Sequence, residues 1–233
     1  MALMLKSGIA PLHSWSPEMV NKFSPLAMFM FLTLQKIVPI LIIFSSWLEL
    51  LILICLVNIA IGSVGGLSQS SILKMMIFSS INNVGWMLMS ISSSSTLFWV
   101  FFITYCLINA SLLLFIFNLK MKWIIQVKSN KMVDKLSFFS LMMSMSGLPP
   151  LLGFIPKWII IKNMNHNWPL INFMSILFSL LTLFFYMKSM MNIIITSVST
   201  KKWVFFVPTP IKMLQLLMIE LHLHIYKMNF YKI

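Results

Sequence analysis

Charged residues are scarce in this sequence, and acidic ones are the scarcest. Only 9% of its 233 residues are charged, whereas an average soluble domain carries about 25%. Arginine is absent, and Asp and Glu together number four. Hydrophobic residues make up 60% of the chain, and its mean hydropathy is +0.96. Such a chain cannot cover a soluble core with polar side chains. Its continuous apolar runs predict an all-α, polytopic transmembrane helix bundle.

Cysteine is also rare, and the motifs of soluble enzymes are missing. Cys55 and Cys106 lie in the middle of apolar runs, where cysteine is typical as a small hydrophobic residue rather than as half of a disulfide. The sequence has no glycine-rich phosphate loop, no CxxC pair and no Ser/His/Asp set. His222 and His224 are two residues apart, which points them to different helix faces. We therefore expect this chain to bind no metal ion and no cofactor.

The apolar runs predict a single membrane domain over residues 1–233. No connection between them is long enough for a soluble domain, and the longest, Lys120–Lys135, is a basic loop. Pro208 and Pro210 make the last predicted span the weakest. The predicted segments are a partial one at 1–15 and full spans at 24–44, 46–66, 71–92, 96–119, 136–161, 168–187 and 203–222.

The lysines outside the spans gather on one side. A net charge of +13 would suit nucleic acid in a soluble protein, but these lysines lie mostly between apolar runs and indicate topology instead. Counting alternate loops places Lys22, Lys120–Lys135 and Lys188–Lys202 together, with Lys162 opposite. The positive-inside rule assigns the larger group to the cytoplasmic or matrix side, and no nucleic-acid partner is expected.

One short motif occurs twice. SGIAPL begins at Ser7 and SGLPPL at Ser146, and each places glycine and proline inside an apolar segment with a lysine nearby, Lys6 and Lys157. Paired segments interrupted by glycine or proline indicate the repeats of transporters, in which broken helices leave backbone groups free to line an ion path. Pro149 and Pro150 predict the second interruption.

Three lysines lie within or beside the apolar segments. Lys36 lies eight residues from the nearer end of its predicted span, which is roughly 12 Å along a helix and beyond easy reach of the interface. A central lysine costs about 2.5–3.5 kcal/mol on insertion scales, so a functional role is favoured. Spacing alone leaves Lys6 open as an interfacial lysine and Lys157 open as one that reaches the surface. Their broken-helix context favours burial, because a protonated lysine can meet the freed carbonyls.

Other polar residues have two interpretations each. His13 follows the first interruption and either relays protons or caps the turn at the interface. Asn82 and Asn83 form a polar patch in an apolar run with Ser79 and Ser80, and they either join helices by hydrogen bonds or order water.

Buried lysines favour proton transfer over metal transport. A row of positive charges repels a metal cation, whereas burial disfavours the charged form of lysine and lets it exchange a proton. Anion conduction stays open on the residues alone.

Four ordered stretches carry a family resemblance. They are LKSGIAPLHSWSPEM, LTLQKIVP, GGLSQSSILKMMIFSSINNVGWML and SGLPPLLGFIPKW. Together they resemble the subunit 2 family of mitochondrial NADH–ubiquinone oxidoreductase, respiratory complex I, up to about Lys188. The resemblance implies an antiporter-like fold of two inverted repeats, each with one discontinuous helix. It also implies a multi-pass protein of the mitochondrial inner membrane, with the basic loops on the matrix side and other membrane-arm subunits as partners.

The resemblance also assigns residues. Lys6 and Lys157 match the lysines on the two broken helices, Lys36 matches the central lysine of the helix after the first break, and Lys74 matches a basic position before SSINNVGW. These residues are implied to pass protons across the membrane, driven by quinone reduction elsewhere. NADH and ubiquinone are used by the whole complex and none of its redox centres belongs to this subunit.

Two departures from the family accompany the resemblance. The chain starts at the first broken helix, before which the family has a buried glutamate, so we expect a fragment whose first repeat is truncated. Asn83 stands where the family often has histidine, and asparagine can orient water but cannot carry a proton.

Two other functions stay open at this point. One is a membrane scaffold whose lysines pair with carboxylates of neighbouring subunits without transport. The other is an independent cation/proton antiporter.

Overall fold

Helices make up most of the described structure. The computed structural model describes residues 2–46, 48–124, 126, 132–165 and 168–197, and within these ranges the chain forms ten α-helices and one short 3-10 helix. The elements are α1 (Ala2–Ser7), α2 (Trp15–Met19), η1 (Val20–Lys22), α3 (Pro25–Leu32), α4 (Leu34–Ser46), α5 (Leu48–Gly66), α6 (Ile72–Ser93), α7 (Ser95–Asn118), α8 (Met132–Ser146), α9 (Phe154–Met164) and α10 (Pro169–Ser197).

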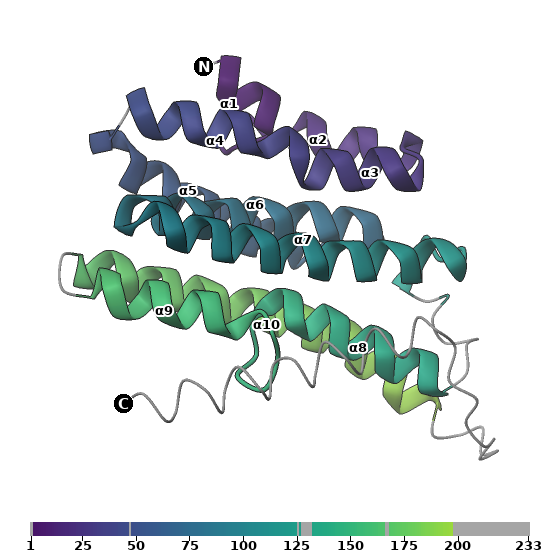
Figure 1. Cartoon of the computed structure of the whole chain (residues 1–233). Helices are drawn as coiled ribbons and strands as arrows, with labels where there is room; N and C mark the ends of the chain where they lie inside the picture. The colour runs from purple at the N-terminus through teal and green to yellow at the C-terminus, as the bar shows by residue number, and fades with distance from the viewer. Residues whose placement is uncertain (1, 47, 125, 127–131, 166–167, 198–233) are drawn as a thin grey trace.

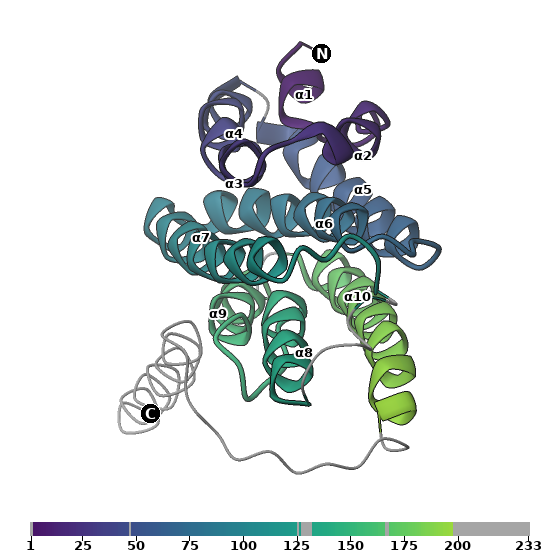
Figure 2. The same cartoon turned by 90° about the vertical axis from the view of Figure 1, so that its right-hand side faces the viewer.

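The helices are arranged in three layers. Figure 1 shows α1–α4 above, α5–α7 in the middle and α8–α10 below, and the turned view of Figure 2 shows the same order. Contacts agree with this arrangement, because α3 and α4 meet the middle layer from one face and α8, α9 and α10 meet it from the other. The two segments with the repeated motif therefore lie in the two outer layers.

Helix α6 forms the centre of the core. Every residue from Met75 to Ile91 is buried, although this stretch includes two asparagines and several serines. A helix that is buried all round belongs to the inside of a bundle. The polar patch at Ser79–Asn83 consequently faces neighbouring helices rather than lipid.

Helices α5 and α6 pack unusually closely through glycine. A Cβ atom added to Gly62 would meet the backbone of Asn82 and Phe78, and one added to Gly85 would meet Ile59 and the carbonyl of Cys55. Small residues permit such close approach between helices in membranes. The middle layer is therefore tightly joined at its centre.

Four helices in the described ranges are long and apolar enough to cross a membrane. They are Pro25–Ser45, which includes α3 and α4, then α6, α7 and Pro169–Ser189 of α10. The predicted span 46–66 corresponds to α5, within which Leu51–Gly66 is a shorter apolar helix. The predicted span 203–222 lies outside the described residues.

Two predicted spans each consist of two helices in the structure, and of these two interruptions only the one in 136–161 was predicted. The span 24–44 bends at Thr33, whose φ of −115° and ψ of −82° leave the helical range and divide α3 from α4. The Thr33 hydroxyl donates to the Phe29 carbonyl at 2.7 Å, which competes with regular helix bonding. The span predicted at 136–161 consists of α8 and α9. Together these helices extend from Met132 to Met164, with the interruption between them.

The chain direction alternates from one long element to the next. The beginning of α3, the end of α7, the beginning of α8 and the end of α10 lie at one end of the bundle, on the right of Figure 1. Lys135, which was predicted in the basic loop, is instead buried on α8 at 5% exposure. The side of the membrane that each end of the bundle faces stays a prediction.

Candidate functional site

The break between α8 and α9 begins at a glycine. Gly147 follows the last residue of α8 with a φ of +84°, and the N–H of Leu148 donates to the carbonyl of Met143 at 3.3 Å. This is the bonding of a Schellman C-cap, in which a left-handed residue ends the helix. Pro149 and Pro150 come after this cap and are exposed in the connecting turn. The helix thus ends at Gly147, and the two prolines prevent it from resuming at once.

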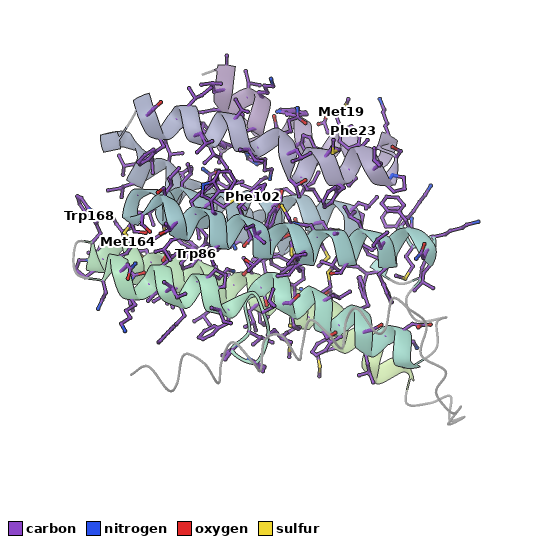
Figure 3. The ribbon with its side chains drawn as sticks, in the orientation of Figure 1. Met19, Phe23, Trp86, Phe102, Met164 and Trp168 are labelled. Carbon is purple, nitrogen blue, oxygen red and sulfur yellow. The ribbon has the colours of Figure 1, made fainter. Side chains whose placement is uncertain are left out.

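Lys157 reaches back across this break. It lies on the first turn of α9 and is 5% exposed, and its Nζ donates to the carbonyl of Ser146 at 2.8 Å. The carbonyls at a helix C-terminus carry partial negative charge, so they suit an ammonium group. The same Nζ lies 5.6 Å from the ring centroid of Trp86 on α6, within the range of cation–π attraction. Trp86 is labelled in Figure 3.

A small cavity lies beside Lys157. Its polar lining comes from four helices: Asn83 of α6, Thr104 and Tyr105 of α7, Ser144 of α8 and Lys157 of α9. The space open to the centre of a water-sized molecule is about 10 Å³, close to the minimum for one water molecule. The structure thus brings Lys157 and Asn83, which are far apart in the sequence, to one cavity.

The first break has the same backbone. Gly8 follows the last residue of α1 with a φ of +66°, and the N–H of Ile9 donates to the carbonyl of Met4 at 3.0 Å. The N–H of Ala10 donates to the side-chain oxygen of Asn58 on α5 at 2.8 Å. The repeated motif is therefore a repeated structure, and the first copy is held by the middle layer.

Lys36 is also buried, but it lies on α4 in the opposite outer layer and does not line the Lys157 cavity. It is 3% exposed and lies on the first turn of α4, where its N–H donates to the carbonyl of Thr33 at the bend. Pro39 lies within the same helix and removes one backbone donor. Of the acidic side chains that the structure describes, Glu18 is exposed on α2 and Asp134 lies on the first turn of α8. Lys36 and Lys157 are thus each buried on the first turn of a helix that follows a bend or a break.

The other lysines and the histidine of the predicted site lie nearer the surface. Lys6 is exposed on α1, the helix that packs against α4. His13 is half-buried after the first break, with Nδ1 3.2 Å from the carbonyl of Pro11 and its ring against Phe78. Lys74 is half-buried on the first turn of α6. The roles of these three residues stay predictions.

Sequence reasoning missed several residues of the site. Trp86 and Tyr105 were not singled out, because each is a common residue of apolar helices. Asn58 was also missed, and asparagine in the middle of an apolar run is a signal that could have found it. The carbonyl of Ser146 could not be predicted from a pattern of side chains, because it is a backbone group.

A layered bundle of apolar helices, with an interrupted segment in each outer layer and a lysine buried beside the second interruption, is typical of antiporter-like membrane proteins. Residues 1–185 match the family described as NADH:quinone oxidoreductase/Mrp antiporter, transmembrane. The chain belongs to this family.

Curated relatives and solved structures agree with the assignment. NADH-ubiquinone oxidoreductase chain 2 of Anopheles gambiae is 36% identical over 206 residues, covering 86% of this chain and 60% of the relative. A subunit of respiratory complex I from Thermus thermophilus superposes with a TM-score of 0.77 at 18% identity, covering 95% of this chain and 54% of that one. An archaeal membrane-bound sulfane sulfur reductase gives a TM-score of 0.78 at 17% identity, covering 99% and 52%.

These comparisons confirm the predicted resemblance to subunit 2 and the predicted antiporter-like fold. The two solved structures are below 25% identity and support the fold alone. The chain spans about three fifths of the length of the curated relative from Anopheles.

Proposed function

We propose that this chain acts as a membrane-arm subunit of a proton-translocating NADH–ubiquinone oxidoreductase in the mitochondrial inner membrane. In this role it passes protons across the membrane through buried lysines and water, while NADH oxidation and quinone reduction occur elsewhere in the complex. The other membrane-arm subunits and the lipid bilayer are its partners, and its basic loops face the matrix. The curated relatives named NADH-ubiquinone oxidoreductase chain 2 support the assignment to this complex.

The observation that carries the proposal is the burial of Lys36 and Lys157 at 3% and 5% exposure in a membrane bundle. Lys157 has a backbone carbonyl as its partner rather than a carboxylate. A lysine that gives up its proton loses a charge-assisted hydrogen bond but leaves no buried anion behind. Such a group can alternate between charged and neutral forms, as proton transfer requires.

Electrostatic repulsion is the coupling that the proposal invokes between proton carriers. Two unit charges about 7 Å apart repel by about 2.4 kcal/mol at an effective dielectric constant of about 20. This exceeds the 1.36 kcal/mol that corresponds to a tenfold change in proton affinity. Lys36 on α4 and Lys157 on α9 lie in opposite outer layers, so coupling between these two lysines requires polar groups and water in the middle layer between them.

Replacing Lys36 with Met in the assembled complex tests the proposal. We expect fewer protons pumped per NADH oxidised, because the buried carrier is removed while the electron-transfer centres are untouched. The matched control is Lys162→Met, since Lys162 is exposed near the end of α9 and contacts the ring of Trp158 at 5.8 Å. Proton uptake and NADH oxidation are measured together in liposomes containing the purified complex.

An unchanged pumping ratio in the Lys36→Met complex would contradict the proton role. Electron transfer with full pumping would instead favour a scaffold. Transport by the purified chain without the complex would favour an independent antiporter.

A further inference from the structure

Tyr105 places a buried polar group in the core. The residue is 3% exposed, and its hydroxyl has the Asn109 and Ser80 side chains nearby but no hydrogen bond of good geometry to either of them or to another described residue. In a membrane bundle such a group cannot turn toward bulk water. Leaving it without a partner costs about 1–3 kcal/mol, so a fold that retains it requires a physical reason.

Tyr105 lines the cavity beside Lys157. Asn83 and Ser144 lie on the same cavity from α6 and α8. The Ser144 hydroxyl already donates to the carbonyl of Leu141 at 2.6 Å, so the oxygen of Ser144 faces the cavity only as an acceptor. A water molecule in this cavity meets a donor in Lys157 and a group in Tyr105 that both donates and accepts. Two to four polar partners are what a buried water requires.

A second unsatisfied oxygen continues from Tyr105 along α7. Asn109 is fully buried one turn further on, and its Nδ2 donates to the Tyr105 carbonyl at 3.0 Å. This bond fixes the amide and leaves the Asn109 side-chain oxygen without a partner among the described residues. Because residues four apart share a helix face, both groups point to the same side of α7.

The opposite side of this polar strip comes from α6 and α10. The Ser80 side chain lies next to the Tyr105 hydroxyl, and the Ser79 side chain lies next to the hydroxyl of Tyr186 on α10. The Tyr186 hydroxyl is likewise buried without a partner of good geometry in the described chain. Polar groups from α7 and α10 thus gather around the serines of α6, and of these residues Tyr105 also lines the Lys157 cavity.

We propose that Tyr105 is a positioning residue of the proton path: its hydroxyl holds a water molecule against Lys157 and Asn83. Asn109 and the serines of α6 extend this hydrated strip away from the break. Tyr105 keeps its own proton and acts through the water that it orients. This inference rests on the proposed function, in which Lys157 carries a proton.

The variant that tests the inference is Tyr105→Phe in the assembled complex. It removes one oxygen and keeps the ring that packs in the core. We expect proton translocation to fall by roughly five- to tenfold, as expected for the loss of one hydrogen bond to a transferring group. Electron transfer in the presence of an uncoupler should stay within about twofold of the original complex, because a defect confined to the path leaves the redox centres intact.

Ser111→Ala is the matched control. Ser111 is a buried hydroxyl on the same helix, but it donates to the carbonyl of Ile108 at 2.8 Å and does not line the cavity. We expect its pumping to equal that of the original complex. If Tyr105→Phe also pumps normally while Lys157→Met does not, the role of Tyr105 is wrong and the proposed function stands. If Lys157→Met pumps normally too, the proposed function fails with it.

A cryo-EM map of the complex that resolves water gives an answer independent of variant assembly. We expect density within hydrogen-bond distance of both the Tyr105 hydroxyl and Lys157 Nζ, and its loss in the Tyr105→Phe complex. A dry cavity in the original complex would overturn the inference.

Discussion

The break between α1 and α2 and the break between α8 and α9 end their first helix with the same hydrogen bonds around a left-handed glycine. They differ in what holds the chain afterwards. In the first break a side chain of another helix, Asn58, accepts from the backbone. In the second, Lys157 from the continuing helix donates to the backbone. The same backbone is therefore used once as a donor site and once as an acceptor site.

The alignment of the two motifs can be continued beyond their six positions, of which four are identical. Lys157 lies eleven residues after Ser146, and the residue eleven positions after Ser7 is Glu18. Each follows a proline, Pro156 and Pro17, but Lys157 is buried whereas Glu18 is exposed. The comparison teaches that the repeat conserves the shape of the interruption while the charge placed in it is free to change.

The largest difference between the breaks should follow from Gly153→Ala. A Cβ atom at Gly153 would meet the carbonyl oxygen of Ser144, so the two sides of the second break would have to separate. We expect a loss of about 3 kcal/mol in stability, the upper range for overpacking a core. The equivalent residue of the first break, Ser14, already has a Cβ atom and is exposed. Ser14→Ala should change stability by less than about 0.5 kcal/mol. The temperature of half-inactivation and the yield of assembled complex are measured for both variants. Equal losses in Gly153→Ala and Ser14→Ala would contradict the tighter packing of the second break.

Asn58→Leu should weaken the first break by an intermediate amount. The substitution leaves the N–H of Ala10 buried without its partner, at a cost of about 1–3 kcal/mol. The second break should be unaffected, because its carbonyl is bound by Lys157. Limited proteolysis of the assembled complex around residues 8–14 and 147–153 measures each break separately. Asn163→Leu, at an exposed position of α9, is the control. Increased cleavage at both breaks would contradict separate support.

The smallest expected effect distinguishes the two glycines. An added Cβ atom at Gly8 has its nearest neighbour, Ser16, at 3.6 Å, whereas at Gly147 the side chain of Lys157 is at 3.0 Å and the Gly153 carbonyl at 3.2 Å. Both alanine variants incur the left-handed backbone cost of about 1–2 kcal/mol. Gly147→Ala should cost about 1 kcal/mol more, because Lys157 must move. Thermal inactivation of the paired variants checks this, and a larger effect at Gly8 would contradict the crowding at Gly147.

The sequence was most informative where single residues act locally. Glycine and proline inside apolar runs predicted both breaks, since these residues have backbone requirements that do not depend on distant contacts. The burial of Lys36 followed from its distance to the ends of an apolar run. The bend at Thr33 was not predicted, because threonine is common inside helices and its bond to Phe29 is one of several that it can form.

Other features depend on which helices meet. The Tyr105 hydroxyl, the Lys157 cavity and the ring of Trp86 come together from α6, α7 and α9, and no local pattern determines that packing. Pro149 and Pro150 predicted the second interruption, whereas the left-handed backbone that ends helix α8 lies at Gly147. Exposure of Lys6 on α1 likewise depends on tertiary surroundings that spacing alone does not define.

The three layers have an electrical consequence. The two breaks lie in the two outer layers, with α5–α7 between them (Figure 2). A tightly packed layer of apolar helices has a low dielectric constant. A charge on one side of such a layer interacts electrostatically with a charge on the other side, although no ion passes between them. The buried serines and asparagines of α6 place polar atoms inside this layer. The middle layer therefore lies between Lys36 on α4 and Lys157 on α9, so the charge of one lysine acts on the other only through this layer and its polar atoms.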